Sequence, residues 1–203
     1  MDSIQTLTEL FKEFPGIGPR QARRFVYFLL SKDAAYNAKL ASLISKLREN
    51  VSTCEMCRRF FRGNGVKTCP TCSDTKRDKT KMMIVARDID FENIEKTKAF
   101  LGYYFVLGGT VPILEKNPGE KIHEHDLGLV VAKRINDGLL EIILATDYNP
   151  EGEHTREYIA RSIKNSFPDN NIKISTLGRG LSLGTELEYS DGDTLRDALQ
   201  SRR

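Results

Sequence analysis

Residues 141–154 read EIILATDYNPEGEH, and this stretch decides the fold class of the chain. The apolar run Ile142 to Ala145 predicts a buried strand, and a helix is predicted from Glu153 to about Asn165. The same alternation recurs along the chain, with apolar strand patterns at 82–86, 103–109 and 172–178 and helical patterns at 90–100, 126–136 and 194–200. Strands that alternate with helices predict a mainly parallel sheet covered on both faces.

Three carboxylates, Asp147, Glu151 and Glu153, follow the strand of the opening stretch. An α/β fold places its chemistry at the carboxyl ends of its strands, and oxygen ligands suit Mg²⁺. This position raises the question of whether the cluster is a working metal site or does no catalysis. We expect the nearby histidines, His123, His125 and His154, to be solvated loop residues.

Ahead of this region, the N-terminal segment predicts three helices. Ser3 is the expected N-cap of the first, and the second and third are predicted at Arg20 to Ser31 and Asp33 to Glu49. FPGIGPR, residues 14–20, separates the first two, because its prolines and glycines cannot continue a helix.

The turn between these two helices has the features of a phosphate-binding site. Glycines at 16 and 18 allow a tight hairpin whose backbone N–H groups, at the start of the next helix, can bind a phosphate. On that helix one face carries arginines together with Tyr27, and Ala22 and Val26 lie on the opposite face. The predicted DNA contacts are Gly16, Ile17, Gly18, Arg20, Arg23 and Arg24.

Charge is distributed unevenly along the chain. Residues 1–81 hold 16 lysines and arginines against 8 acidic residues, whereas the remainder holds 15 against 20. A basic N-terminal third suggests a polyanionic partner. No apolar run is long enough to span a bilayer and no secretory signal is visible, so we expect a cytoplasmic protein with no membrane partner.

The cysteines form the most specific motif. All four fall in the pattern Cys54-x2-Cys57-x11-Cys69-x2-Cys72, and two disulfides are not expected in a reducing cytosol. Paired CxxC motifs bring four thiolates to one tetrahedral Zn²⁺ and leave no open position for a substrate. The sequence therefore predicts one structural zinc per chain, in a segment too short to form its own core.

These motifs, in this order, resemble the bacterial recombination mediator family RecR over essentially the whole chain. FPGIGPRQARRFVYFLL resembles its helix-hairpin-helix, and CEMC with CPTC resembles its zinc finger. YYFVLGG, EIILATDYNPEGE and GRGLSLGTELEYSDGDTL resemble parts of its Toprim domain. The expected fold is α+β and multi-modular: a helix-hairpin-helix (1–52), a four-cysteine zinc module (53–80), an α/β Toprim domain (81–178) and a C-terminal segment that completes it and its assembly surface (179–203).

The resemblance implies a non-catalytic DNA clamp, assembled as a dimer or tetrameric ring. Such a clamp binds single-stranded, duplex or gapped DNA, and works with RecO, and with RecF where present, to load the recombinase RecA onto DNA coated with single-strand-binding protein. It also implies that Arg20 and Arg24 bind DNA and that Asp147, Glu151 and Glu153 meet a partner protein or line the DNA path.

The residues at the Toprim site argue against catalysis. Register places Ala86 where catalytic members have a glutamate, and Asn149 stands where they have the second aspartate of a metal-binding pair. Alanine neither transfers a proton nor binds a metal, and a bound Mg²⁺ is therefore not expected. Two alternatives stay open: a Mg²⁺-dependent Toprim nuclease or primase-like enzyme, and a zinc-ribbon DNA-binding scaffold.

Overall fold

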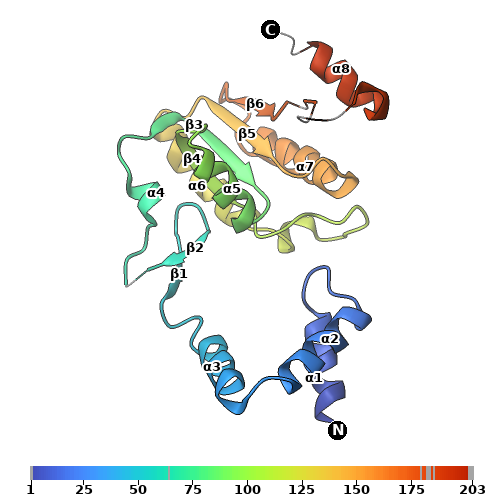
Figure 1. The fold of residues 1–203 in the computed structure, drawn as a ribbon. Helices are drawn as coiled ribbons and strands as arrows, with labels where there is room; N and C mark the ends of the chain where they lie inside the picture. The colour runs from blue at the N-terminus through green and yellow to red at the C-terminus, as the bar shows by residue number, and fades with distance from the viewer. Residues whose placement is uncertain (1, 64, 179, 182–183, 185, 201–203) are drawn as a thin grey trace. The chain divides into compact units, whose positions relative to one another are not determined.

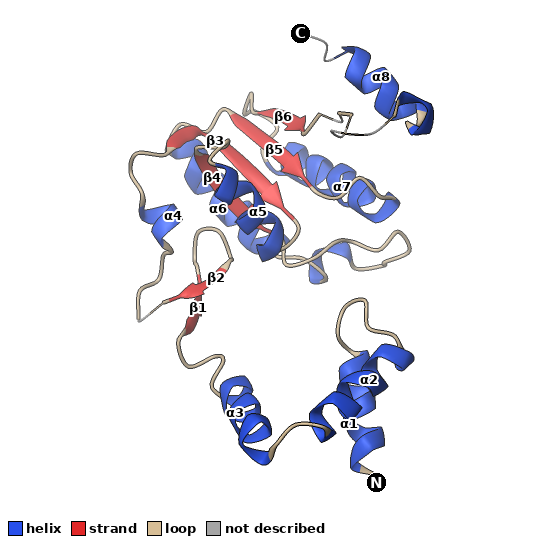
Figure 2. Ribbon diagram, viewed as in Figure 1, coloured by secondary structure: helices blue, strands red, loops and turns tan. Residues whose placement is uncertain are grey.

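The computed structural model describes residues 2–63, 65–178, 180–181, 184 and 186–200 (Figure 1). The chain divides into two compact units, Met1–Val51 and Ser52–Arg203. The described part of the first is built of helices, whereas the second combines helices with a two-stranded and a four-stranded sheet (Figure 2). This arrangement confirms the expected α+β class with a helical N-terminus.

The first unit contains α1 (Ser3–Lys12), α2 (Pro19–Leu30) and α3 (Ala34–Ser45). Ala22 and Val26 of α2 are buried, as their helical spacing predicted. The expected N-cap was wrong by one residue: the Asp2 side chain accepts from the Ile4 N–H at 3.1 Å, and Ser3 is already helical. The third helix ends at Ser45, before the expected Glu49, and residues 46–50 form turns instead.

The four-stranded sheet of the second unit is parallel throughout, in the order β4-β3-β5-β6. Its strands are β3 (Asp78–Val85), β4 (Gly102–Val106), β5 (Glu141–Ala145) and β6 (Lys173–Thr176). The central strand β3 pairs with both neighbours, so that Ile84 lies opposite Phe105 on one side and Leu144 on the other. The prediction of a mainly parallel sheet is confirmed.

Helices contribute to the core on both faces of this sheet. One cluster joins Ile84 and Leu144 to Val131 of α6 (Glu124–Asn136) and Ile159 of α7 (Pro150–Ser166). A second, smaller cluster joins the other face of β3 and β4 to Phe91 of α5 (Asp88–Thr97). Successive buried side chains of β3 and β4 join the two clusters alternately, because neighbouring side chains of a strand point to opposite faces of the sheet.

Two predicted boundaries near the acidic stretch were wrong. The strand expected at 82–86 runs from Asp78 to Val85, so Ala86 follows it. The helix expected from Glu153 begins at Pro150, which places Glu151 and Glu153 in its first turn. The early start follows from local chemistry, because Asn149 caps the helix and a proline at N1 needs no N–H partner.

Several short elements were not predicted: β1 (Val51–Thr53), β2 (Phe60–Arg62), α4 (Pro70–Ser73), and the 3₁₀ turns η1 (Pro118–Glu120) and η2 (Leu187–Tyr189). The final helix, α8, spans Gly192–Gln200, two residues earlier than expected at its start. Of the GRGLSLGTELEY stretch, residues 179, 182, 183 and 185 lie outside the described residues. None of the described helices has both the length and the hydrophobicity needed to cross a bilayer.

Candidate metal centre and nucleic-acid interface

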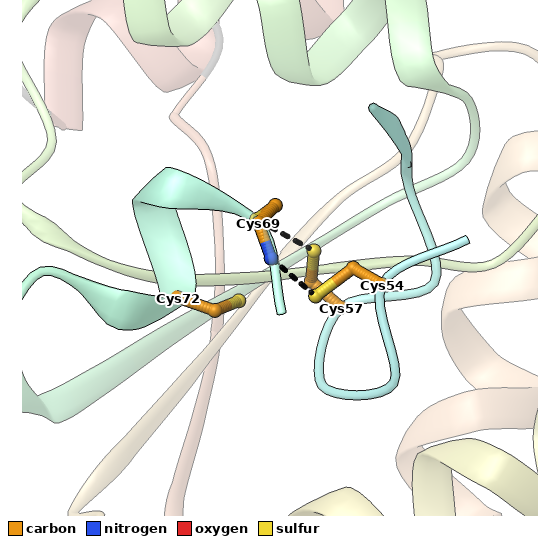
Figure 3. A group of neighbouring side chains, drawn as sticks. All are labelled: Cys54, Cys57, Cys69 and Cys72. Atoms are coloured by element: carbon orange, nitrogen blue, oxygen red, sulfur yellow. Dashed lines mark hydrogen bonds between the residues drawn. The ribbon is translucent and has the colours of Figure 1, made fainter. Parts of the chain in front are cut away.

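The four cysteines converge on one point (Figure 3). Their sulfur atoms all lie within 4.8 Å of one another, and the Cys57 and Cys69 sulfurs are 3.6 Å apart. Four thiolates around a tetrahedral Zn²⁺, each at about 2.3 Å, would have sulfurs about 3.8 Å apart. The donor set and its spacing therefore fit one tetrahedral metal ion.

Local backbone geometry explains how two sequence-distant pairs meet. Cys54 and Cys57 both lie in the tight turn between β1 and β2, in which Arg58 adopts a left-handed conformation with φ of 61°. Cys69 and Cys72 come from the start of α4, and the Cys69 N–H donates to the Cys54 sulfur at 3.3 Å. Three of the four cysteines are buried, and Phe61 completes their small cluster.

The four thiols also form hydrogen bonds with one another, which shift their pKa values. The hydrogen bond between Cys54 and Cys57 lowers the pKa of Cys54 and raises the pKa of Cys57. A metal ion would displace these shared protons, since only thiolates are metal ligands. The cluster thus has the number, spacing and chemistry of ligands expected of a structural metal centre.

This cysteine module is attached to the edge of the parallel sheet. The Val106 N–H of the edge strand β4 donates to the Cys57 carbonyl at 2.8 Å. Nearby, the Phe60 N–H donates to the Asp88 carboxylate at 2.8 Å, and the Arg59 guanidinium lies 4.3 Å from the centroid of the Phe91 ring. These contacts join the module to α5 and β4.

In the first unit the GIG turn forms as expected, although its two glycines serve different purposes. Gly16 has φ of +75°, a conformation that L side chains rarely adopt, and the Ile17 N–H closes the turn on the Phe14 carbonyl at 3.0 Å. Gly18 is extended and is the N-cap of α2, with no side chain to cap the helix. The first N–H groups of α2 are therefore available to an anion.

The arginine face of α2, formed by Arg20, Arg23 and Arg24, lies beside this turn. All three side chains are exposed, and no salt bridge within the described residues involves any of them. They line a groove of about 400 Å³ between α1 and α2. The groove is completed by Thr8, Glu9, Lys12, Pro19 and Tyr27. The sequence analysis assigned no role to Lys12. Its spacing of four and three residues from Thr8 and Glu9 places the three on one face of α1.

The acidic residues of the opening stretch do not assemble into a metal site. Asp147, Glu151 and Glu153 are all exposed, and Glu151 accepts from the Thr110 hydroxyl at 3.3 Å. Within the described residues, the cysteines form the only group of metal-ligating side chains close enough to hold an ion. The stretch has carboxylates at a strand end without the convergence that a Mg²⁺ site requires.

The residues around the expected Toprim site have structural partners instead. Ala86 is fully buried, and Asp88 and Asp90 accept hydrogen bonds from the backbone of Phe60 and Arg87. Asn149 accepts from the Gly152 N–H at 2.8 Å and caps α7.

Arg156 was missed by sequence reasoning. Its guanidinium is buried and donates to the carbonyls of Thr146 and Asp147, at 3.2 and 2.9 Å. The positive charge of Arg156 thus lies against the backbone at Asp147, where it is bound by these two carbonyl oxygens.

Comparison with known proteins places these sites in a family. Residues 4–48 match the family model described as RecR, helix-hairpin-helix, residues 80–177 match the Toprim domain, and residues 180–203 match RecR, C-terminal. The four cysteines fall between the first two matches.

Full-length relatives agree with these matches. "Recombination protein RecR" of Tropheryma whipplei strain Twist is 36% identical over 202 residues, covering 98% of this chain and 96% of the relative. Its namesake in Bifidobacterium animalis subsp. lactis is also 36% identical, over 203 residues, with 99% and 96% covered. That of Mycobacterium leprae is 33% identical over 201 residues, with 98% and 96% covered.

Proposed function

We propose that this chain, which belongs to the RecR family of recombination proteins, is a DNA-binding mediator of recombinational repair that performs no covalent chemistry. The observation that carries the proposal is the exposed arginine face beside the uncapped N-terminus of α2. Both features suit phosphate groups, the first through charge and the second through backbone N–H groups. Neither reads base edges, so the expected binding does not depend on sequence.

The remaining assignments follow from family membership. We propose that the cysteines hold a structural Zn²⁺, that the protein acts in the cytoplasm, and that it forms a dimer or tetrameric ring around or across DNA. In this role it works with RecO-like and RecF-like proteins to load RecA onto DNA coated with single-strand-binding protein, and Asp147, Glu151 and Glu153 face a partner or the DNA path. A strict monomer at micromolar concentration in light scattering would contradict the ring.

The DNA-binding assignment predicts the effect of removing two charges. Arg20→Ala combined with Arg24→Ala should weaken binding to all DNA sequences alike, by about 10-fold or more at low salt. The plot of log affinity against log salt should become shallower by about 2, because two fewer phosphates release counterions. Fluorescence anisotropy over a salt series measures both quantities.

A matched control makes the same change of charge at α3, where Lys39 lies within the helix and Lys46 is its C-cap. Lys39→Ala combined with Lys46→Ala removes two exposed cations that do not line the groove. This control should leave affinity nearly unchanged. Equal losses in the two double variants would show that net charge, rather than the α2 face, determines binding.

The alternative, a Mg²⁺-dependent Toprim enzyme, predicts metal-dependent turnover of DNA, whereas the proposed mediator predicts none. With millimolar Mg²⁺ or Mn²⁺ and labelled DNA, we expect neither cleavage nor synthesis from the wild type. The reason is that buried Ala86 and the capping Asn149 supply no carboxylate at the two Toprim positions. Metal-dependent turnover that Asp147→Asn abolishes would establish the enzyme instead.

A further inference from the structure

We infer that Tyr27 is a base-stacking position at the end of the arginine face, so that this unit binds unpaired bases as well as phosphates. The inference rests on the proposed DNA-binding function and specifies its ligand as a single-stranded segment. Tyr27 lies on α2, one helical turn beyond Arg23 and Arg24, and lines the same groove. Its ring is thus next to the charges that would hold the backbone of the strand.

The Tyr27 ring is available for a ligand. It is 55% exposed, and it has no aromatic or cation–π partner within the part of the chain that the structure describes. Other exposed rings of this unit are paired: Phe14 contacts Phe11 at 5.6 Å between centroids, and Phe28 contacts Tyr36 at 6.2 Å. Tyr27 therefore stands out as an exposed aromatic side chain of this unit that has no ring partner among the described residues.

The surroundings of the ring select the class of ligand. Lys12 and the three arginines supply four cations to the groove, against one carboxylate, Glu9, which lies 2.5 Å from the Lys12 ammonium. A fitting ligand must be anionic and must also offer a flat apolar face to the ring. Single-stranded DNA has both, whereas duplex DNA keeps the faces of its bases stacked inside.

The size of the groove agrees with this ligand. Its volume of about 400 Å³ lies in the ordinary range for small-ligand sites, roughly 300–1,000 Å³. One nucleotide can enter with its phosphate toward the arginines and its base on Tyr27. Base stacking on an aromatic side chain is sequence-tolerant, which is consistent with sequence-independent phosphate contacts.

An abasic probe separates stacking from phosphate binding. We compare the full chain binding a thymidine oligonucleotide and an abasic oligonucleotide of the same length, which has the same phosphates and no bases. The wild type should bind the thymidine strand about 10-fold more tightly. Tyr27→Leu should remove this difference by weakening only the thymidine complex, and Tyr27→Phe, which keeps a ring, should restore it.

Tyr36→Leu is the matched control, since it removes an exposed tyrosine of the same unit that does not line the groove. It should keep the thymidine preference. If the wild type binds both strands equally and with normal salt dependence, the stacking inference fails while the DNA-binding function stands. If it binds neither strand, the proposed function itself fails.

A spectroscopic readout tests direct contact. The chain contains no tryptophan, so Tyr27→Trp introduces a single indole fluorophore. Thymidine strands should quench its emission at saturation, and abasic strands should leave it nearly unchanged, because only a stacked base contacts the ring. Tyr36→Trp should show no such difference. Equal quenching by the two strands at position 27 would overturn the inference.

Discussion

Removing the proposed Zn²⁺ from the four-cysteine cluster, by a strong chelator or by Cys57→Ser, is expected to unfold the segment that carries the cysteines and destabilise the second unit by about 3 kcal/mol or more. The reason is that this segment has almost no core of its own. Its buried cluster consists of Phe61 and three of the cysteines, with Met56 and Cys72 packed against them. Without a cation the clustered thiols have only weak hydrogen bonds to replace metal–sulfur bonds.

Unfolding of the cysteine segment should also affect the parallel sheet, at the backbone N–H of Val106. The Val106 N–H donates to the Cys57 carbonyl, so loss of the module leaves that edge-strand N–H without its partner. Hydrogen exchange should show faster exchange at Val106 after chelation, with Ile84 in the central strand still protected. Thermal unfolding with and without chelator measures the stability change.

Ser73→Ala is the control for Cys57→Ser. Ser73 is exposed and follows Cys72 in α4, and its hydroxyl contacts only the Thr68 hydroxyl, at 3.1 Å, among the described residues. Its loss should change stability by less than about 0.5 kcal/mol. A melting temperature that does not respond to chelation would mean that the cysteine cluster holds no structural metal.

The convergence of the four cysteines could be predicted from sequence because their spacing is a local property of the chain. Two CxxC pairs determine four ligands whatever the intervening residues do. The shape of the segment could not be predicted, since β1, β2 and α4 are too short to show periodicity. The attachment of the segment to β4 could not be predicted either. It rests on a backbone hydrogen bond between Val106 and Cys57, and backbone hydrogen bonds do not depend on side-chain identity.

The strand pattern shows the same limit. The apolar residues of β3 that the sequence revealed, Met82 to Val85, are all buried. Its first residues, Asp78 to Lys81, pair through the backbone, yet their side chains are polar and only partly buried or exposed. A hydrophobic pattern indicates burial, so it does not detect a strand segment whose side chains lie at the edge of the core.

The opening stretch shows how a residue type can suggest chemistry and serve structure. Asn149 was interpreted as a lost metal ligand, and the structure gives it a positive role as the N-cap of α7. No site was predicted at Arg156. Its buried guanidinium donates hydrogen bonds to the carbonyls of Thr146 and Asp147, which follow β5. Both roles depend on backbone atoms brought together by the fold, which residue identity alone does not specify.

Gly152→Ala is expected to be among the most damaging single substitutions in the α/β domain, costing about 3 kcal/mol or more. A Cβ at this position would lie 2.1 Å from the Asp147 carbonyl oxygen and 2.8 Å from its carbon. These are backbone atoms and cannot move aside without shifting the end of β5 or the start of α7. The shift would also break the 2.8 Å bond from the Thr146 hydroxyl to the Gly152 carbonyl.

Gly128→Ala provides the contrast, because a Cβ there meets no heavy atom within 4 Å and the residue lies inside α6. It should stabilise the domain by about 0.5–1 kcal/mol, the usual gain of alanine over glycine in a helix. Urea denaturation of both variants measures the difference. If Gly152→Ala is tolerated as well as Gly128→Ala, the close approach of α7 to Asp147 is wrong.

The expected result would give the acidic turn a structural role in the α/β domain. Glu151 and Glu153 flank a glycine that the packing of α7 on β5 requires, and Asn149 and Arg156 hold the same turn from either side. The turn would then stabilise the domain whether or not it binds a metal. The sequence ATDYNPEGEH then forms a structural corner of the domain, with the carboxylates of Asp147, Glu151 and Glu153 exposed.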